Sequence, residues 1–470
     1  MSQMLKSSGA MAAATMLSRV LGLVREIAYA GFMGDSAVAS AFKFAFVVPN
    51  LFRRLLGEGA LTAAFIPIFK EKEKTAGEAE MWRAANAVIS AVVIVSAGII
   101  ALVLLGVSLV LAWGALEANT RLMLELLRVM LPYLLLVCLA AIFMGMLNAR
   151  GYFFIPALGA TMLNVVMIAS VYLAAPRFGA TKETQIFALA CGVVVAGIAQ
   201  AVFQLPSLHR EGFRLAWVRP WPDDTVRQVV RKMIPAALGV AAYQINIMIT
   251  FALGFRVDET VVASFDYAVR LMELPQGVFG VSLATYLLPT LSGLAVERKY
   301  PEFRATLARG VSYLAFVNAL AAALLVALAE PMIRLLFERG AFDVLSTKRA
   351  TLALQCLAPG LLGFSLVNVL ARAFFALGDT QTPMRISVFC LGFNVLLAFL
   401  FVEPLRQGGL ALANTLSSVV NVLLLLHALR RKLGRLEFAD VRKHLPLLFA
   451  CAVLAGWIGW GLARWWSAAW

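Results

Sequence analysis

Two arginines lie inside an apolar segment near the start of the chain, in the stretch SRVLGLVREIAYAG from Ser18 to Gly31. Insertion scales place the cost of an arginine near the centre of a membrane helix at about 3 kcal/mol, whereas a leucine returns about 0.5 kcal/mol. Arginine cannot lose its proton to avoid this cost. Polar residues recur on one helical face of the segment, at Thr15, Ser18, Gly22, Arg25 and Tyr29. We therefore expect Arg19 and Arg25 to face protein or water and not lipid.

Other charged residues also lie at membrane depth, and cations outnumber carboxylates among them. The set is Arg19, Arg25, Glu26, Lys43, Arg128, Asp266, Arg270, Glu273 and Arg372. Guanidinium groups bind phosphate and carboxylate in a bidentate manner, and these bonds are strong where water is scarce. The surplus of cations predicts a binding site for an anionic, phosphorylated substrate. Internal salt bridges, such as Arg25 with Glu26 or Glu273 and Arg270 with Asp266, are the alternative interpretation.

The composition of the chain indicates which elements must position these charges. Of its 470 residues, 61% are hydrophobic and 14% are charged, which lies far outside the range of water-soluble domains. Apolar runs of roughly 20 residues, the length that a membrane helix needs, recur along nearly the whole chain. The sequence therefore predicts an all-α integral membrane protein. About thirteen spans are expected, near residues 10–32, 36–56, 86–113, 124–148, 157–175, 185–206, 232–254, 260–291, 307–328, 350–376, 384–402, 409–429 and 445–465.

The net charge of +15 is explained by the membrane class, because cytoplasmic loops of membrane proteins collect Lys and Arg. With the amino terminus in the cytoplasm, roughly 25 loop cations fall on the cytoplasmic side and about 10 on the other side. We therefore expect a multi-pass protein with a cytoplasmic amino terminus, and we do not expect nucleic acid as a partner.

Two internal similarities indicate that the chain arose by duplication. The segment Phe42 to Ala45 resembles Phe265 to Ala268, 223 positions later, and the segment Ala149 to Pro156 resembles Ala376 to Pro383, 227 positions later. About six spans fit into one copy, and an even number makes both copies cross the membrane in the same sense, as in transporters built from parallel repeats. Chance similarity between Ala- and Phe-rich segments is the alternative.

The duplication predicts two pseudo-symmetric six-helix lobes around a central cationic cavity, with at least one extra helix at the carboxyl end. The amino-terminal lobe is expected over residues 1–215 and the carboxy-terminal lobe over residues 216–435. Residues 436–470 are expected to form an additional transmembrane segment, the thirteenth.

Enzyme motifs are missing from the sequence. It contains no GxxxxGK[ST] motif for ATP hydrolysis, and its loops carry no acidic cluster suited to Mg²⁺. The five cysteines lie singly in apolar segments, which is typical of buried apolar side chains and not of metal or disulfide sites. The sequence therefore favours a transporter, with no metal site and no organic cofactor, over an enzyme.

Five motifs carry a resemblance to a known family. They are SRVLGLVRE (Ser18 to Glu26), PNLFRRLLGEGALTAAFIPIF (Pro49 to Phe69), RLMELPQGVFGVSLAT (Arg270 to Thr285), LFERGAF (Leu336 to Phe342) and ALGDTQTP (Ala376 to Pro383). Together they resemble the MurJ/MviN family of lipid II flippases, within the multidrug/oligosaccharidyl-lipid/polysaccharide exporter superfamily. The similarity in pattern covers almost the whole chain.

This resemblance implies alternating-access transport of lipid II, the undecaprenyl-pyrophosphate-linked peptidoglycan precursor. The lipid would move from the inner to the outer leaflet of the bacterial cytoplasmic membrane, in support of peptidoglycan synthesis and cell shape. The resemblance assigns substrate binding to Arg19, Arg25, Arg53 and Arg270. It assigns supporting or structural roles to Glu26, Ser40, Lys43, Glu58, Asp266 and Glu273.

The chain departs from the family pattern at three points. Members often have Asp where this chain has Ser40 and an acidic residue where it has Val269, and Lys43 and Asp266 are expected to restore part of the charge balance. Members usually have fourteen spans, the last two of which help to form a groove for the lipid tail, whereas about thirteen are counted here.

The driving force and some functional alternatives remain open at this point. The membrane potential is one driving force, and a sodium gradient is the other, with Asn246, Asn394 and Asn414 as candidate Na⁺ ligands; helix packing is the alternative role of these residues. A flippase for another polyprenyl-pyrophosphate glycan, such as an O-antigen unit, would need the same arginines. A cation-coupled drug exporter would instead need cavity carboxylates, and a scaffold protein of the division machinery would need neither. The expected partners are lipid II, membrane lipids and proteins of cell-wall synthesis.

Overall fold

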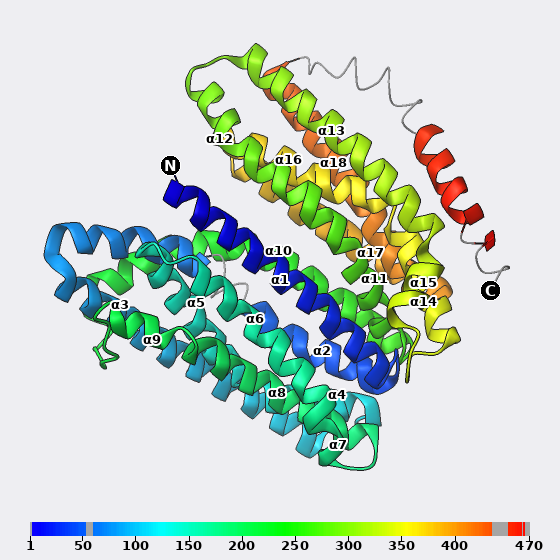
Figure 1. Cartoon of the computed structure of the whole chain (residues 1–470), viewed down its shortest axis with the longest axis horizontal. Helices are drawn as coiled ribbons and strands as arrows, with labels where there is room; N and C mark the ends of the chain where they lie inside the picture. The colour runs from blue at the N-terminus through cyan, green and yellow to red at the C-terminus, as the bar shows by residue number, and fades with distance from the viewer. Residues whose placement is uncertain (1, 53–59, 435–449, 463, 466–470) are drawn as a thin grey trace. The chain divides into compact units, whose positions relative to one another are not determined.

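The computed structural model describes residues 2–52, 60–434, 450–462, 464 and 465, without the side chains of residues 2–15, 60, 62, 63, 160, 235–240, 242 and 243. Helices form this part of the chain, and no strand occurs in it (Figure 1). The chain divides into two compact units, residues 1–248 and 249–470. The predicted all-α class is confirmed.

The first unit is a bundle of mostly long apolar helices. They are α1 (Ser2–Met33), α2 (Ala37–Phe52), α3 (Ala60–Trp113), α4 (Ala118–Met130), α5 (Tyr133–Ala149), α6 (Phe154–Ala169), the π-helix η2 (Ser170–Ala174), α7 (Ala175–Phe178), α8 (Lys182–Val202), α9 (Leu205–Arg210) and most of α10 (Asp224–Val257). Phe65, Phe69, Phe143 and Phe213 anchor a core in which α3 and α5 meet the loop after α9. Helix α1 packs along α6, and α2 packs along α4 (Figure 1).

The second unit repeats this plan. It contains α11 (Val261–Pro275), the π-helix η3 (Gln276–Val281), α12 (Ser282–Val296), α13 (Tyr300–Ala327), α14 (Ala329–Phe337), α15 (Val344–Leu357), α16 (Gly360–Ala376), α17 (Gln381–Leu405) and α18 (Gln407–Leu433). A last helix covers Ala450–Leu462. Phe303, Leu314, Phe374 and Leu425 belong to a core shared by α12, α13, α16 and α18.

Helices that are long enough to cross a membrane occur throughout the described chain. Seven helices are long and apolar enough to cross a membrane, and nine are if each of two bent pairs counts as one span. Three shorter apolar helices, Ala37–Phe52, Gln244–Val257 and Ala450–Leu462, fall where further spans are predicted. The helices therefore support a multi-pass membrane protein.

Two bent helix pairs provide structural support for the duplication. Helices α4 and α5 are bent by 42° at a short break, and α15 and α16 are bent by 46° at an equivalent break. Helix α5 begins at Tyr133 and α16 begins at Gly360, which is 227 positions later, the offset predicted from the sequence. A chance similarity between apolar segments would not reproduce a bend at the same place.

The turns after these pairs also match at the level of single hydrogen bonds. Gly151 and Gly378 have φ angles of +88° and +74°, a left-handed conformation that glycine adopts at helix ends without strain. In each turn the next residue donates its backbone N–H five residues back: Tyr152 to the Leu147 carbonyl, and Asp379 to the Phe374 carbonyl, both at 2.9 Å. The two halves therefore share one turn geometry, which supports the predicted repeat.

The limits of the predicted lobes stay a prediction. The division between the two units falls within α10, which runs continuously from Asp224 to Val257. A division inside a helix does not decide to which lobe the helix belongs, so the limits of 1–215 and 216–435 are not tested. Residues 435–449, where the third predicted segment begins, lie outside the described chain.

In both units, side-chain hydrogen bonds and ion pairs join the turn to the end of a later helix. In the first unit the Tyr152 hydroxyl donates to Glu211 Oε1 at 2.7 Å, and Arg150 Nε lies 2.8 Å from Glu211 Oε2. In the second unit Lys432, at the end of α18, pairs with Asp379.

The hydrogen bonds from Tyr152 and Arg150 hold the pKa of Glu211 below its usual value. Burial alone would raise the pKa of Asp379, but its bonds to Lys432 and Thr382 outweigh burial and lower it.

Arg150→Ala should destabilise the first unit, because this arginine also pairs with Glu73 and with Glu78, 2.9 Å away, and its side chain is only 19% exposed. The free energy of unfolding is expected to fall by about 1–2 kcal/mol, which lies between the values measured for exposed and for buried ion pairs. Because the pKa of Glu211 is lowered by folding, the contribution of its pair is present above the unfolded pKa of about 4.3 and is lost as the pH falls through the folded value.

Thermal unfolding of the detergent-solubilised protein should therefore show a difference between wild type and Arg150→Ala at pH 7 that shrinks below about pH 4. The exposed Arg210 is close in sequence to Glu211 and supplies the control, Arg210→Ala, which should unfold like the wild type. A difference that persists unchanged at low pH would contradict an ion-pair origin.

Candidate functional site

A cluster of charged and polar side chains lies between three helices of the first unit. We call Arg25 and Glu26 of α1, Lys43 of α2 and Asn164 of α6 the first-unit cluster. Arg25 Nη2 lies 2.6 Å from Glu26 Oε1, and Arg25 Nη1 donates to Asn164 Oδ1 at 3.0 Å. Lys43 Nζ lies 3.5 Å from Glu26 Oε2. One guanidinium group is thus held by a carboxylate and an amide from two different helices.

Helix packing fixes the orientation of Arg25. Asn164 Nδ2 donates to the Ser18 carbonyl at 3.1 Å, so the amide joins α6 to the backbone of α1 while its oxygen accepts from Arg25. One turn after Arg25, Tyr29 lies under the guanidinium group at 5.5 Å from the ring centroid. The same ring packs edge-on against Phe42 of α2. These contacts place Arg25 where α1, α2 and α6 meet.

The first-unit cluster is largely withdrawn from solvent. The side chains of Arg25, Glu26 and Lys43 are 14%, 5% and 6% exposed. Charged groups in such a setting interact more strongly than at a surface, and each needs a partner to offset the loss of water. The charged members of the cluster are two cations and one carboxylate, so these three residues together carry a net charge of +1.

A second cluster lies on a single helix of the second unit. In this second-unit cluster, Arg270 Nη1 lies 3.0 Å from Glu273 Oε2, and Arg270 Nη2 lies 3.4 Å from Asp266 Oδ1. Arg270 and Glu273 are 34% and 40% exposed, and Asp266 is 10% exposed. All three side chains belong to α11 and are spaced one turn apart, so their pairs are weaker than those of the first-unit cluster.

The two clusters differ in net charge. The second-unit cluster has one cation, Arg270, and two carboxylates, Asp266 and Glu273, and the surplus of cations around a substrate stays a prediction. The internal ion pairs offered as the alternative interpretation, Arg25 with Glu26 and Arg270 with Asp266, both form. Among the described members of both clusters, the excess of positive charge resides in the first unit.

The model of one protein family matches this chain from residue 29 to residue 470, and that family is described as the lipid II flippase MurJ. The chain belongs to the MurJ family. Curated relatives agree over nearly their whole length. A protein named "Probable lipid II flippase MurJ" from Vibrio cholerae serotype O1 is 32% identical, with 98% of this chain and 92% of the relative covered. A protein named "Lipid II flippase MurJ" from Burkholderia cenocepacia is 33% identical, with 95% and 88% covered.

Solved structures support the MurJ fold. A structure titled "Lipid II flippase MurJ, inward closed conformation" covers 96% of this chain and 97% of its own, with a TM-score of 0.79 and 23% identity. An inward-facing multidrug resistance MATE family transporter of the MOP superfamily matches with a TM-score of 0.71 and 16% identity, covering 92% of this chain and 99% of its own. At these identities both structures speak for the fold alone.

The remaining residues assigned by resemblance to MurJ lie in different surroundings. Arg19 is exposed on α1, and Ser40 is fully buried on α2. Arg53 and Glu58 lie outside the described residues. The structure therefore brings together Arg25, Glu26 and Lys43 in one cluster, and Asp266, Arg270 and Glu273 in another. Substrate binding by Arg19, Arg25, Arg53 and Arg270 stays a prediction.

The sequence did not single out Asn164, which is 6% exposed and bonds to Arg25. An amide carries no charge, so it did not stand out among the charges at membrane depth. Its position within the apolar helix α6 is the one signal that could have marked it, because a buried polar side chain in an apolar helix needs a partner.

The three asparagines proposed as Na⁺ ligands lie on three different helices. Asn246 lies on α10 in the first unit, and Asn394 is buried on α17 in the second. Asn414, on α18, donates to the Leu410 carbonyl of its own helix at 2.9 Å. No group of three or more His, Cys, Asp or Glu side chains suited to a metal ion occurs among the residues that the structure describes. The role of the asparagines in sodium coupling stays a prediction.

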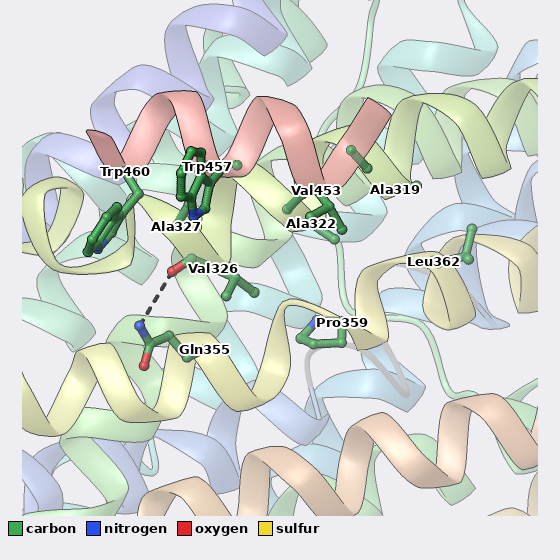
Figure 2. Close-up of a pocket in the computed structure, with 13 residues that line it drawn as sticks. Ala319, Ala322, Val326, Ala327, Gln355, Pro359, Leu362, Val453, Trp457 and Trp460 are labelled. Atoms are coloured by element: carbon green, nitrogen blue, oxygen red, sulfur yellow. Dashed lines mark hydrogen bonds between the residues drawn. The ribbon is translucent and has the colours of Figure 1, made fainter. Parts of the chain in front are cut away.

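An apolar pocket of about 580 Å³ lies in the second unit beneath the last described helix, Ala450–Leu462. Figure 2 shows Trp457 and Trp460 of this helix above Val326 of α13 and Gln355 of α15. The side-chain amide of Gln355 donates to the Val326 carbonyl at 3.4 Å. The other lining residues are Ala319, Ala322, Ala323, Ala327, Pro359, Leu362, Ala452, Val453 and Gly456. None of these described lining residues is charged, so this part of the pocket suits an apolar chain and not a phosphate group.

Proposed function

We propose that this chain is a lipid II flippase, a transporter that moves lipid II from the inner to the outer leaflet of the bacterial cytoplasmic membrane for peptidoglycan synthesis. Membership of the MurJ family over residues 29–470 supports this function. The observation that carries the chemistry is Arg25, a largely buried arginine in a cluster with one more cation than carboxylates. A lipid-linked diphosphate is an anion that such a cluster can bind.

The geometry of the first-unit cluster suits a diphosphate for two reasons. Arg25 presents a planar set of N–H donors, and such a set matches two phosphate oxygens at once. Asn164 and the stacked ring of Tyr29 hold the guanidinium group before the substrate arrives, so little side-chain freedom is lost on binding. The sugar-peptide head would occupy hydrated space, and the prenyl chain would remain in apolar surroundings.

Transport follows an alternating-access cycle in this proposal. The amino terminus lies in the cytoplasm, as the loop cations predict. An inside-negative membrane potential contributes about 2.3 kcal/mol per charge per 100 mV. It favours outward movement of an anionic lipid and inward return of an empty cationic site. The potential can therefore drive both half-steps of the cycle, the loaded outward step and the empty return step.

The two alternative functions, an O-antigen flippase and a drug exporter, have less support from the relatives of this chain. An O-antigen flippase would use the same arginine cluster, but the relatives that match over most of their length are named lipid II flippases. A multidrug resistance MATE family transporter shares the fold at 16% identity, which does not support a drug-exporter function for this chain. Proteins of cell-wall synthesis remain proposed partners beside lipid II and the membrane lipids.

Complementation tests this function directly. Expression of the wild-type chain in a bacterium depleted of its own lipid II flippase should restore growth and return accumulated lipid II to its normal level, measured by mass spectrometry of extracted lipids. A chain that serves only as a division scaffold would restore growth equally well with Arg25→Ala. Growth without a fall in accumulated lipid II would contradict the proposal.

A further inference from the structure

We propose that the loop of residues 213–221 is an interfacial anchor, which places Trp217 in the phospholipid headgroup layer of the membrane. This segment, called the anchor loop below, has the sequence FRLAWVRPW and contains neither helix nor strand. The inference goes beyond lipid II transport and uses only the membrane location of the chain. In the proposed orientation the leaflet is the cytoplasmic one.

The backbone of the anchor loop is bonded to polar side chains of α3. The Asn86 amide donates to the Arg214 carbonyl at 2.9 Å, and its oxygen accepts from the Ala216 N–H at 3.2 Å. One turn further along α3, Ser90 Oγ accepts from the Val218 N–H at 3.2 Å. These three hydrogen bonds fix the height of the loop along the helix.

Both ends of the anchor loop return to an earlier part of α3. Phe213 is fully buried, and its ring centroid lies 5.5 Å from that of Trp82. Just after the loop, Asp223 Oδ2 lies 2.9 Å from Arg83 Nη1. The loop therefore leaves α3 near Trp82, reaches Ser90 at its middle and comes back to Arg83. Its middle is the part that lies furthest toward the apolar run of α3.

The length of this apolar run sets the depth of the loop. Helix α3 carries no charged residue from Ala87 to Ala112, a length of about 39 Å at about 1.5 Å per residue. The hydrocarbon core of a bilayer is about 30 Å thick, and the headgroup layers bring the total to about 40–45 Å. The run therefore fills the hydrocarbon core, and its two ends reach the headgroup layers. Ser90 lies near one end, so the middle of the anchor loop lies at headgroup level.

The exposed side chains of the anchor loop suit this layer. Trp217 and Trp221 are 64% and 66% exposed, and Leu215 is also exposed. Arg214 and Arg219 flank Trp217 and are exposed as well. Tryptophan prefers the membrane interface because it combines a large apolar ring with one N–H donor. Arginine keeps its stem in apolar surroundings while its guanidinium group reaches phosphate oxygens.

A cytoplasmic protein is the other class of partner for an exposed surface of tryptophan and arginine. Such a partner needs a surface that stands clear of the membrane, whereas the bonds to Asn86 and Ser90 keep the anchor loop beside the apolar run of α3. The negative surface potential of the cytoplasmic leaflet also attracts cations that lie within a Debye length of it. Depth and charge together favour phospholipid headgroups.

Fluorine NMR of the purified full chain in lipid nanodiscs tests the depth of Trp217. Fluorotryptophan replaces tryptophan, and Trp217→Phe identifies the Trp217 resonance by its loss. The discs contain phosphatidylethanolamine and phosphatidylglycerol. A nitroxide at the top of a lipid acyl chain should broaden this resonance beyond detection, whereas a soluble gadolinium chelate should leave it visible. Trp113, which is 84% exposed at the other end of the apolar run, is the positive reference and should behave in the same way.

Charge reversal tests whether lipid phosphates are the partners of the two arginines. In a chain with both Arg214→Glu and Arg219→Glu, the phosphates should repel the loop, so that the gadolinium chelate now broadens the Trp217 resonance. The matched control is Arg227→Glu, which reverses an arginine that is 79% exposed on α10 and should leave Trp217 as in the wild type. An unchanged Trp113 resonance shows that each variant remains folded.

Three results would overturn the anchor. Broadening of wild-type Trp217 by the chelate alone would place the loop in water and favour a cytoplasmic protein as its partner. A Trp217 resonance that neither agent broadens would place the side chain inside the protein. A Trp217 resonance that keeps its wild-type behaviour after the double charge reversal would exclude lipid phosphates as partners. Lipid II transport is not measured in these experiments, so their outcome is independent of the proposed function.

Discussion

Replacing Arg25 with alanine should lower lipid II transport by about 100-fold or more, equivalent to about 2.7 kcal/mol. The side chain is 14% exposed and bonds both Glu26 and Asn164. Its removal deletes the charge-assisted bonds to the diphosphate, each worth about 1.5–3 kcal/mol. It also leaves the first-unit cluster with one cation and one carboxylate, so its net positive charge disappears.

Arg25→Lys tests whether charge alone suffices. Lysine keeps the positive charge but lacks the planar set of donors that reaches Asn164, Glu26 and a phosphate at once, so it should recover less than about a tenth of the lost transport. The matched control is Arg128→Ala, because Arg128 is an exposed arginine on α4 of the same unit. Transport per folded protein is measured in proteoliposomes that contain lipid II. Wild-type transport by Arg25→Ala would refute the assigned role.

Much of the architecture could be predicted from the sequence, because it depends on local composition. Apolar runs of membrane-spanning length predict helices wherever they occur. The repeat is visible in the sequence around Gly151 and Gly378, but the bends between α4 and α5 and between α15 and α16 were not predicted. The cost of placing an arginine in lipid was enough to single out Arg25 and Arg270.

The partners of those arginines could not be predicted in the same way. Whether Glu26 faces Lys43 depends on the rotation of α1 against α2, and whether Arg25 reaches Asn164 depends on its packing along α6. Neither rotation is encoded in the spacing of residues within one helix. Pairs between neighbours on one helix were within reach of the sequence: the Arg25–Glu26 and Arg270–Asp266 pairs were both offered as alternatives, and the structure adds the pair of Arg270 with Glu273.

Removing the membrane potential should slow lipid II transport by about 50-fold at a starting potential of 100 mV, if one net charge moves in the slow step. The physical reason is the charge of the moving parts. The substrate is an anion, and Arg25, Glu26 and Lys43 together carry one net positive charge. An inside-negative potential favours both the loaded outward step and the empty return step. Either step loses this contribution when the voltage is zero.

Proteoliposomes allow voltage and sodium to be varied separately. A potassium gradient with valinomycin sets the potential, and Na⁺ is replaced by choline at constant voltage. Transport should follow the potential and should change by less than about twofold when Na⁺ is removed, because one charge across 100 mV already supplies about 2.3 kcal/mol. Transport that needs Na⁺ at every potential would instead favour sodium coupling. Asn394→Ala, which removes a buried amide of α17, would then be the next variant to measure, since loss of a ligand should raise the sodium concentration needed for half-maximal transport.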